Sequence, residues 1–343
     1  CLSREDKPEF AHGYVHEHYL DFIDNSVEIT FEISSNIKEN FAYQAGQYIT
    51  IRKQFDEDDI RRAYSLCSDP NSDKLSIGVK KVEGGVMSTY LTKELKEGDD
   101  LLVMEPNGNF ILQGNNVVGI CAGSGITPIL SMIKSKSTNL SLVYGNQSPS
   151  TAMFLDEVIE MDLDLHLAYS KQVVDGCYNG RIDSNFLEIL SNDESFLLAD
   201  HYFICGPGDM ISDTESFLLS NGVDKSQIHF EKFTSDSSGR SNEITLEDTT
   251  ISDVTVIIDG DEFSYELPYN GDTILDSALD NGADLPYSCK GAVCCTCKAK
   301  VMEGEATMDQ NFSLSDEEVE SGYVLACQAH PSSKNIIIDF DEI

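Results

Sequence analysis

Four cysteines crowd into nine residues of this chain, and no other feature restricts its fold and chemistry so strongly. The stretch from Cys289 reads CKGAVCCTC, so Cys289, Cys294 and Cys297 follow the spacing Cys-x4-Cys-x2-Cys, and Cys327 stands thirty residues further on. This spacing, with a distant fourth thiolate, is typical of a [2Fe–2S] cluster. Zinc is the alternative, but structural zinc sites usually pair two Cys-x2-Cys knuckles, and this stretch has one.

The loop also predicts how the cluster is held. Three thiolates close on it from one side, and the fourth comes from a separate segment. Gly291 and the small Ala292 and Thr296 allow backbone N–H groups to point at the sulfurs, which tunes the reduction potential. Cys295 has the wrong spacing for a ligand, so we predict a non-ligand side chain there. The predicted ligands are Cys289, Cys294, Cys297 and Cys327.

The remaining cysteines favour a reducing compartment. Outside the last part of the chain they are isolated, whereas a disulfide framework would spread evenly through a small secreted domain. The stretch CLSREDKPEF has no basic region followed by an apolar run, so we expect no signal peptide. No apolar run is long enough and free enough of charge to span a bilayer. We therefore expect a cytoplasmic protein that does not bind membranes.

The chain is strongly acidic, with a net charge of −37. A surface of this sign repels polyanions, which argues against nucleic acid as a partner. Two interpretations of the charge stay open from the sequence. It either solubilises the protein or steers it toward a basic protein partner.

With 343 residues, the chain is long enough for two or three domains. Residues 1–113 contain short alternating stretches such as VEITFEI and QYITIRKQF, separated by turn signals. GDDLLVMEPNGNFIL adds an expected strand pair around Pro106-Asn107-Gly108. Closely spaced strands of this kind predict an antiparallel β-barrel.

Residues 114–233 follow a different pattern. NVVGICAGSGITPILSMIKS reads as a buried strand, a Gly-rich turn and a helix, and HYFICGPGDMISDTESFLLSNG repeats this order. NLSLVYGNQ and DLDLHLAYS are further strands. Strands that alternate with helices predict a parallel sheet covered on both faces.

The last part of the chain divides into a predicted linker, 234–250, and a small domain, 251–343. The linker is rich in Ser, Thr, Asp and Glu, and as a flexible chain it would span roughly 20–25 Å. The domain opens with a hairpin, VTVIIDG and EFSYELP, and a short helix from Thr273, before the cysteine loop. The predicted fold class is therefore a multidomain α+β and α/β chain that ends in a β-grasp-like cluster domain.

Two motifs in the first segment have the composition of a flavin site. Arg62-Ala63-Tyr64-Ser65 offers a guanidinium for a diphosphate, a ring that can stack on isoalloxazine and a hydroxyl for its N5. Gly84-Gly85-Val86-Met87-Ser88-Thr89 opens a helix whose N-terminal N–H groups can bind the same anion. The first motif taken alone also fits an ordinary strand.

Two Gly-rich turns in the second segment predict a dinucleotide site. Gly123-Ser124-Gly125-Ile126-Thr127-Pro128 follows one strand, and Cys205-Gly206-Pro207-Gly208-Asp209-Met210 follows another. Glycines let the backbone approach a pyrophosphate, and the helix dipole favours its charge. The alternative is that Cys205 is simply a small buried residue.

Together these motifs resemble the ferredoxin–NADP reductase family joined to a C-terminal plant-type ferredoxin domain. The resemblance covers nearly the whole chain and is carried by RRAYSLC, VKKVEGGVMSTY, AGSGITPIL and ICGPGDM. ILDSALDNGADLPYSCKGAVC and MDQNFSLSDEEVESGYVLACQA are the more discriminating stretches. They make the chain more similar to the reductase subunits of phenylacetyl-CoA (ring 1,2-) epoxidases than to other three-part reductases.

The resemblance implies that residues 1–113 bind FAD rather than FMN. It places the ring of Tyr64 on the flavin and the hydroxyl of Ser65 at N5. Phe233, at the end of Glu231-Lys232-Phe233, is predicted on the exposed face of the flavin. The implied flavin contacts are Arg62, Ala63, Tyr64, Ser65, Val79, Lys80, Gly85, Val86, Met87 and Ser88.

The resemblance also implies that residues 114–233 bind NAD(P)H. It places Cys205 near the nicotinamide ring and Thr127 near the junction of flavin and nicotinamide, so Ser65 and Cys205 are the predicted catalytic residues. The implied nucleotide contacts are Gly123, Gly125, Thr127, Ser170, Lys171, Gly206, Pro207 and Met210.

The choice between NADPH and NADH depends on a partner for the 2′-phosphate. Relatives often carry Arg where this chain has Gln147, so that cation is missing. Ser170 with Lys171, or Arg181, could replace it. We expect NADPH, with NADH as the alternative.

By this resemblance, NAD(P)H reduces FAD, and electrons then pass singly through the [2Fe–2S] cluster to oxygenase subunits with a di-iron site. The expected acceptor is the phenylacetyl-CoA epoxidase of phenylacetate degradation. Two alternatives stay open. The same relay could serve another oxygenase, desaturase or hydroxylase, or the chain could be a redox sensor that binds these cofactors without turnover.

Overall fold

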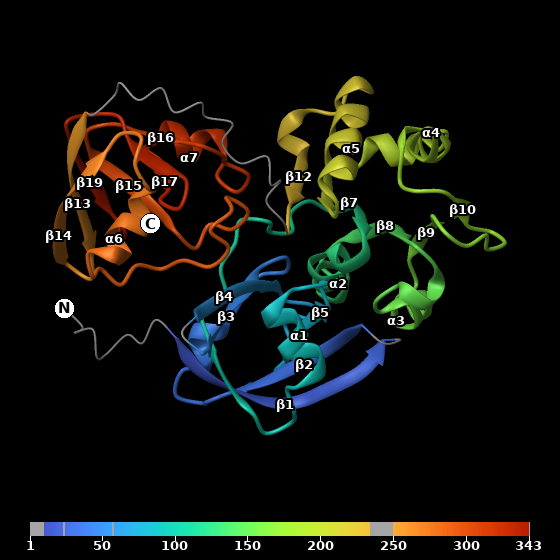
Figure 1. Cartoon of the computed structure of the whole chain (residues 1–343). Coiled ribbons are helices and arrows are strands. Elements are labelled where there is room, and N and C mark those ends of the chain that lie inside the picture. Colours follow the sequence, from blue (N-terminus) through green and yellow to red (C-terminus); the bar gives the residue numbers. More distant parts are fainter. Residues whose placement is uncertain (1–9, 23–24, 57, 234–249, 343) are drawn as a thin grey trace. The chain divides into compact units, whose positions relative to one another are not determined.

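The computed structural model describes residues 10–22, 25–56, 58–233 and 250–342. The described chain forms two compact units, one spanning Phe10–Phe233 and the other lying C-terminal to it (Figure 1). The predicted linker, 234–250, lies outside the described residues apart from Thr250. The boundary predicted between residues 113 and 114 falls inside the first unit and stays a prediction.

The described helices are short. The α-helices are α1 (Val86–Lys93), α2 (Ile126–Lys134), α3 (Leu155–Glu160), α4 (Ser184–Ser191), α5 (Gly208–Ser220), α6 (Ile274–Asp280) and α7 (Asp316–Glu320). Short 3-10 helices cover Lys38–Phe41, Gly123–Gly125, Pro149–Thr151, Glu194–Leu198 and Lys225–Gln227.

An antiparallel sheet forms the first half of the unit Phe10–Phe233. Its strands, in sheet order, are β4 (Asp58–Ser65), β3 (Tyr48–Phe55), β6 (Asp100–Val103), β1 (Ala11–Phe22), β2 (Ser26–Ile33) and β5 (Leu75–Lys80). Alternate residues of β2, Val27, Ile29 and Phe31, face its core. A bridge from Leu66 to Ile77 brings the two edges together, so the sheet curls into the predicted barrel.

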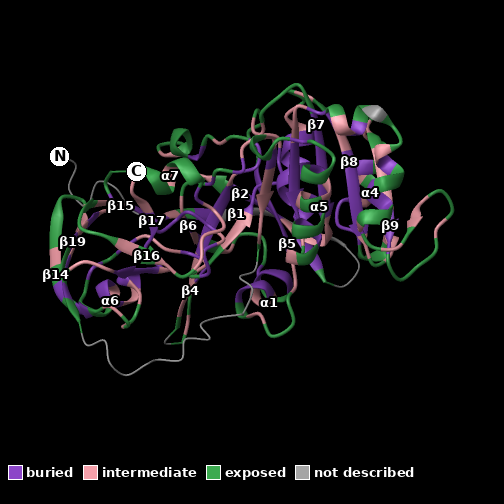
Figure 2. Ribbon diagram, turned by 90° about the horizontal axis from the view of Figure 1, so that it is seen from above, coloured by how far each residue is buried: buried purple, intermediate pink, exposed green. Residues whose placement is uncertain are grey.

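A parallel sheet forms the second half of the same unit. Its strands, in sheet order, are β10 (Tyr178–Asn179), β9 (Asp164–Tyr169), β8 (Asn139–Asn146), β7 (Asn116–Ala122), β11 (His201–Cys205) and β12 (Ile228–Glu231). Val117 and Cys121 of β7 pack with α2 and α3, while Val118 and Ile120 pack with α4 and α5. Figure 2 shows β7 and β8 buried and the outer faces of α4 and α5 exposed, as predicted for a sheet covered on both faces.

The barrel and the parallel sheet share a packed boundary. Ala45, Cys67 and Phe110 of the barrel half belong to the same apolar cluster as α2. The Ser131 hydroxyl on α2 donates a 2.8 Å hydrogen bond to the buried carbonyl of Ser68. The two halves therefore form one compact unit.

The second strand predicted in GDDLLVMEPNGNFIL does not form. β6 ends at Val103, and Asn107 makes only an isolated bridge to Tyr48. Gly108 has φ +120, which takes the chain out of strand conformation. Phe110 packs on Phe203 at a ring-centroid distance of 5.5 Å, so the apolar residues fill the boundary between the halves instead of pairing in a sheet.

The C-terminal unit is built on a mixed sheet with α6 packed against it. Its strands, in sheet order, are β14 (Asp261–Pro268), β13 (Ile251–Ile258), β19 (Asn335–Asp339), β15 (Lys298–Glu303) and β17 (Tyr323–Leu325). β16 (Ala306–Met308) and β18 (Ala329–Pro331) form a separate pair. β13 and β14 form the predicted hairpin, and β13 pairs in parallel with β19. Within the described residues, no helix has the length and apolar character needed to cross a membrane.

The N-terminus of α6 offers a test of the C-terminal unit. The Thr273 hydroxyl accepts a 3.2 Å hydrogen bond from the Asp276 N–H, and Ile274, Leu275 and Ala278 of the helix are fully buried. Removing such a cap costs about 1 kcal/mol. Thr273→Ala should therefore speed amide exchange in α6 about five-fold, measured by hydrogen-exchange mass spectrometry. Thr273→Ser keeps the hydroxyl and should keep the protection; equal protection in both variants would show that the cap contributes nothing.

Candidate functional site

β4 carries the first flavin motif at an edge of the barrel sheet. Arg62 is exposed and Tyr64 half-buried, and the two-residue spacing puts them on the same side of the strand. Burial raises the pKa of the Tyr64 phenol. The neighbouring Arg61 faces inward with its guanidinium 5.0 Å from the centre of the Phe10 ring. Arg62 is therefore the cation of this motif that a diphosphate can reach.

The turn before α1 carries the second motif. Gly84 has φ +74, and Gly85 stands at the N-cap of α1 without a side-chain cap. The Ser88 hydroxyl accepts a 3.1 Å hydrogen bond from the Val82 N–H and holds the turn. The first N–H groups of a helix have no acceptor within it, so this turn can bind an anion. Met87 is buried, and its side chain packs in the barrel core.

β5 ends between the flavin motif and the first Gly-rich turn. The Val79 side chain is fully buried in the barrel core, so only its backbone is available to a ligand. The Lys80 ammonium lies 3.5 Å from the Thr151 carbonyl, and burial lowers its pKa. The Lys80 ammonium also lies 3.8 Å from the position that a Cβ on Gly123 would take. Lys80 is therefore close to the first Gly-rich turn of the nucleotide site, although it is predicted as a flavin contact.

The two Gly-rich turns pack directly against each other at the carboxyl ends of β7 and β11. A Cβ on Gly125 would lie 2.1 Å from the Cys205 carbonyl oxygen, so only glycine fits there. A Cβ on Gly206 would lie 2.6 Å from the Met210 methyl group. The Thr127 hydroxyl donates a 2.9 Å hydrogen bond to the Ser124 carbonyl and fixes the first turn. The backbone can therefore come close to a pyrophosphate at this edge.

Glu231 joins the flavin and nucleotide motifs, although no motif in the sequence predicts a role for it. The Ser65 hydroxyl donates a 3.1 Å hydrogen bond to Glu231 Oε2 across the boundary between the two halves. Cys205 pairs with Glu231 in the parallel sheet and is fully buried. Burial raises the pKa of the Cys205 thiol, and the Glu231 charge raises it further. A neutral thiol, a hydroxyl and a carboxylate thus lie together. The sequence signal for Glu231 as a site residue is its position two residues before Phe233, in Glu231-Lys232-Phe233.

The predicted 2′-phosphate residues lie at two places. Ser170 and Lys171 follow β9, whereas Arg181 is paired with a residue at the start of α5. Ser170 follows β9, and its backbone N–H donates a 2.9 Å hydrogen bond to the Asn146 carbonyl at the end of β8. Lys171 is exposed beside it. Arg181 pairs with Asp209 in the second Gly-rich turn, with 2.8 Å between Nη2 and Oδ2. Its guanidinium is therefore held at the same edge of the sheet as the Gly-rich turns.

Phe233 follows the end of β12 and is 41% exposed. β12 ends at Glu231, so the chain leaves the sheet immediately beside the carboxylate that contacts Ser65. This position agrees with a ring near the flavin face, although the role of Phe233 stays a prediction.

The cluster cysteines form two close pairs. The Sγ atoms of Cys289 and Cys294 lie 3.1 Å apart, and Cys297 and Cys327 are hydrogen-bonded to each other. The hydrogen bond with Cys289 lowers the pKa of the Cys294 thiol, and the hydrogen bond with Cys297 lowers the pKa of the Cys327 thiol. Two thiol pairs are what a binuclear cluster requires, because each iron takes two protein sulfurs. Among the described residues, no three His, Cys, Asp or Glu side chains converge as they would around one metal ion.

The backbone of the cluster loop is bent so that its N–H groups face the sulfurs. Lys290 and Ala292 have φ +49 and +62, which is uncommon for residues other than glycine. The Gly291 N–H lies 3.3 Å from Cys289 Sγ. Outer groups hold this conformation: Ser313 donates to the Cys294 carbonyl and Gln328 to the Lys290 carbonyl.

Cys295 belongs to neither of the two thiol pairs described above. It is 5% exposed and belongs to the apolar core of the C-terminal unit. Cys297 and Cys327 belong to the same core, so burial does not decide its role, and a non-ligand Cys295 stays a prediction.

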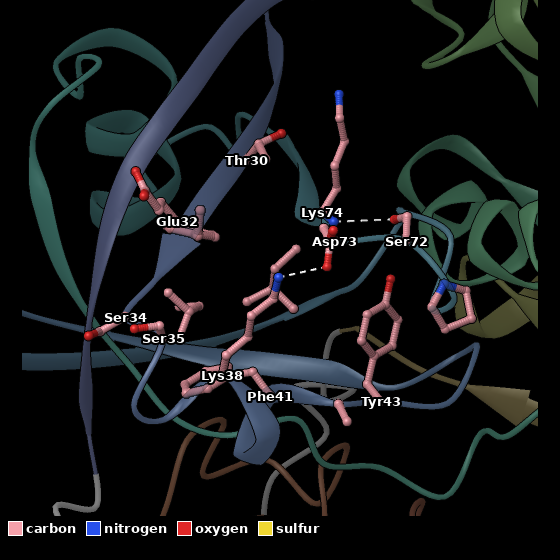
Figure 3. Close-up of a pocket in the computed structure, with 15 residues that line it drawn as sticks. Thr30, Glu32, Ser34, Ser35, Lys38, Phe41, Tyr43, Ser72, Asp73 and Lys74 are labelled. Carbon is pink, nitrogen blue, oxygen red and sulfur yellow. Dashed lines mark hydrogen bonds and ion pairs between the residues drawn. The ribbon is translucent and has the colours of Figure 1, made fainter.

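A pocket of about 900 Å³ lies elsewhere on the barrel (Figure 3). It is lined by Leu75 at the start of β5, whereas Val79 and Lys80 stand at the end of that strand. Lys38 and Asp73 form a 2.6 Å ion pair in it. None of the predicted site residues lines this pocket, so we assign it no part in the site.

Three protein-family models match successive parts of the chain. They describe an oxidoreductase FAD-binding domain over residues 23–111, an oxidoreductase NAD-binding domain over 120–216 and a 2Fe-2S iron-sulfur cluster binding domain over 256–332. These matches confirm the prediction of FAD, a pyridine nucleotide and a [2Fe–2S] cluster as cofactors.

Characterised relatives extend over nearly the whole chain. One component of the 1,2-phenylacetyl-CoA epoxidase of Escherichia coli (strain K12) is 35% identical and aligns over 92% of this chain and 94% of its own length. The ferredoxin reductase component of the 3-ketosteroid-9-alpha-monooxygenase of Rhodococcus rhodochrous is 29% identical over 91% of this chain and 92% of its own.

Solved structures share the fold. Phthalate dioxygenase reductase, described as transferring electrons from pyridine nucleotides to [2Fe–2S], aligns with a TM-score of 0.61 and 22% identity over 99% of this chain and 100% of its own. An intact type IV self-sufficient cytochrome P450 monooxygenase aligns with a TM-score of 0.71 and 20% identity over 96% of this chain and 41% of its own. The predicted fold class is confirmed.

The ligand set can be tested with matched cysteine variants. Cys289→Ser, Cys294→Ser, Cys297→Ser and Cys327→Ser should each lose most of the bound iron and sulfide, since each removes one of the two protein sulfurs on an iron. Cys295→Ser should keep the full content, because the two thiol pairs already supply the four protein sulfurs that the cluster takes. Iron and sulfide analysis with visible circular dichroism measures the outcome. A Cys295 variant as depleted as the other four would make Cys295 a ligand.

Proposed function

The chain belongs to the family of this 1,2-phenylacetyl-CoA epoxidase component, and on that basis we propose that it delivers electrons from NADPH to a partner oxygenase with a di-iron site. The chain is an NAD(P)H oxidoreductase whose domains fit an electron relay. Bound FAD and the [2Fe–2S] cluster supply the conversion between a two-electron hydride donor and a one-electron acceptor.

The observation that supports this proposal is the contact of the two half-sites at Ser65 and Glu231. Ser65 belongs to the flavin motif, and Glu231 is the sheet neighbour of Cys205 in the second Gly-rich turn. Their 3.1 Å hydrogen bond supports a close approach of the proposed flavin site to the proposed nicotinamide site. The fully buried Cys205 thiol is neutral, so it adds no charge beside the proposed nicotinamide site.

Each half-site binds its ligand with different groups. Arg62 and the start of α1 offer a cation and N–H groups to a diphosphate, while Tyr64 offers a ring for stacking. The Gly-rich turns offer the backbone of Gly123 and Gly206 to the second nucleotide. Among the described residues of this site, no pair of side chains is arranged to process an aromatic substrate, so we assign the oxygenation itself to the partner.

The proposed partner is a phenylacetyl-CoA epoxidase. It is supported by 35% identity to the Escherichia coli protein, against 29% or less for the reductases of the 3-ketosteroid and glycine betaine monooxygenases. Those relatives make the second candidate the same relay serving a different oxygenase. The nine described free cysteines fit a reducing compartment, and we propose the cytoplasm.

Anaerobic titration of the loaded protein with NADPH, and in parallel with NADH, tests the relay. We expect the flavin absorbance to bleach and the signal of a reduced [2Fe–2S] cluster to appear in low-temperature electron paramagnetic resonance. Flavin reduction with a silent cluster would contradict transfer between the two cofactors within this chain. A flavin that neither nucleotide reduces would contradict the proposed function altogether.

The preference for NADPH rests on cations at the edge of the parallel sheet. Hydrogen bonds to charged groups contribute about 1.5–3 kcal/mol, so Lys171→Ala or Arg181→Ala should raise the KM for NADPH by about 10- to 100-fold. The KM for NADH should hardly change, because NADH lacks the 2′-phosphate. Lys225→Ala removes an exposed lysine that precedes β12 and serves as the control. Equal effects on both nucleotides would assign these cations to the pyrophosphate instead.

A further inference from the structure

Gly78 lies in the middle of β5, where the barrel meets the parallel-sheet half of the same unit. A Cβ at this position would lie 2.7 Å from Thr127 Cγ2, 2.8 Å from Phe154 Cε2 and 3.0 Å from Phe154 Cζ. Gly78 has no positive φ, so its backbone conformation is open to any residue. Glycine is required here for space alone.

Neither neighbour can swing aside easily. Thr127 is 2% exposed, its β-branched side chain is restricted in a helix, and its hydroxyl is bound to the Ser124 carbonyl. Phe154 is 3% exposed and stands at φ 57 and ψ 20, a left-handed conformation that is unusual for an aromatic residue. The packing that holds Phe154 in this conformation also fixes its ring against β5.

The space beside Gly78 that a Cβ would fill lies between the proposed flavin site and the proposed nucleotide site. Its strand neighbours are Val79 and Lys80, which lead to the flavin side, and Thr127 belongs to the first Gly-rich turn on the nucleotide side. The distance between β5 and this turn is therefore set where Gly78 has no side chain. A methyl group there would have to move backbone on one side or the other.

We propose that Gly78 is a positioning residue for hydride transfer, which lets the nucleotide turn approach the flavin strand closely enough for reaction. The inference rests on the proposed function. Hydride transfer needs reacting atoms about 3–3.5 Å apart, and a displacement of about 1 Å can cost about 100-fold in rate. Gly78 touches neither reacting group; it acts through the approach of Thr127 and Phe154.

Gly78→Ala in the full, cofactor-loaded chain tests the proposal. We expect unchanged FAD content and a flavin reduction rate with NADPH lowered about 10- to 100-fold in anaerobic stopped-flow measurements. The dissociation constant for NADPH should change far less than this rate. The kinetic isotope effect with NADPH deuterated at the transferred hydrogen should increase, because the hydride step becomes slower relative to binding.

Two glycines provide matched controls. A Cβ on Gly13 would lie 2.8 Å from Val103 Cγ2 within the barrel, and one on Gly119 would lie 2.7 Å from Ile129 Cγ2 within the parallel-sheet half. Gly13→Ala and Gly119→Ala create similar crowding, but neither lies at the boundary between the halves. They should lower thermal stability as much as Gly78→Ala while keeping the wild-type rate of flavin reduction.

If Gly78→Ala binds FAD poorly, a second variant tests the proposal. Thr127→Ser on the Gly78→Ala background removes the methyl group nearest the new Cβ and keeps the hydroxyl. Recovery of FAD content together with the reduction rate would support the proposal, and recovery of FAD content with the rate of Gly78→Ala unchanged would overturn it. A wild-type rate in Gly78→Ala, or equal slowing in all three alanine variants, would also overturn it. If NADPH and NADH both fail to reduce the wild-type flavin, the proposed function itself fails.

Discussion

Close contact between the barrel and the parallel sheet is the constraint on which the proposed chemistry depends. A flavin site and a nucleotide site are useful together only if their reacting ends meet, and a flexible boundary would not hold them within reach. The chain meets this demand with small groups. Gly125 allows its turn to lie on the Cys205 backbone, Gly78 allows Thr127 to lie on β5, and Ser131 bonds the Ser68 carbonyl across the boundary.

The C-terminal unit solves a different problem, because its site is made by a loop rather than by a boundary. Four sulfurs must gather in two pairs, which forces Lys290 and Ala292 into left-handed backbone conformations. The cost of each is offset by outer hydrogen bonds that engage the loop carbonyls and leave the N–H groups facing inward. The Gln328 side chain has a second effect, since it links the loop at Lys290 to the residue after Cys327.

The sequence is sufficient to predict local features that residues close together in the chain determine. Three cysteines of one loop and one distant cysteine are the predicted ligands, and the structure places them in two thiol pairs. The glycine turns at strand ends follow from backbone geometry alone. What it could not predict depends on contacts between distant residues. Ser65 and Glu231 are 166 positions apart, and nothing near Gly78 in the sequence indicates that Phe154 fills the space beside it. The prediction of a strand after Gly108 is wrong for the same reason, because Phe110 packs on Phe203 in the other half of the unit.

The division of the chain follows from the two kinds of transfer that the proposed relay combines. A hydride moves as an atom with two electrons, so its donor and acceptor must touch, and both half-sites lie within one compact unit, Phe10–Phe233. A single electron does not require its donor and acceptor to touch. The cluster cysteines accordingly all belong to the C-terminal unit, which has an apolar core of its own. Cluster assembly therefore depends on contacts within one unit, and hydride transfer depends on contacts within the other.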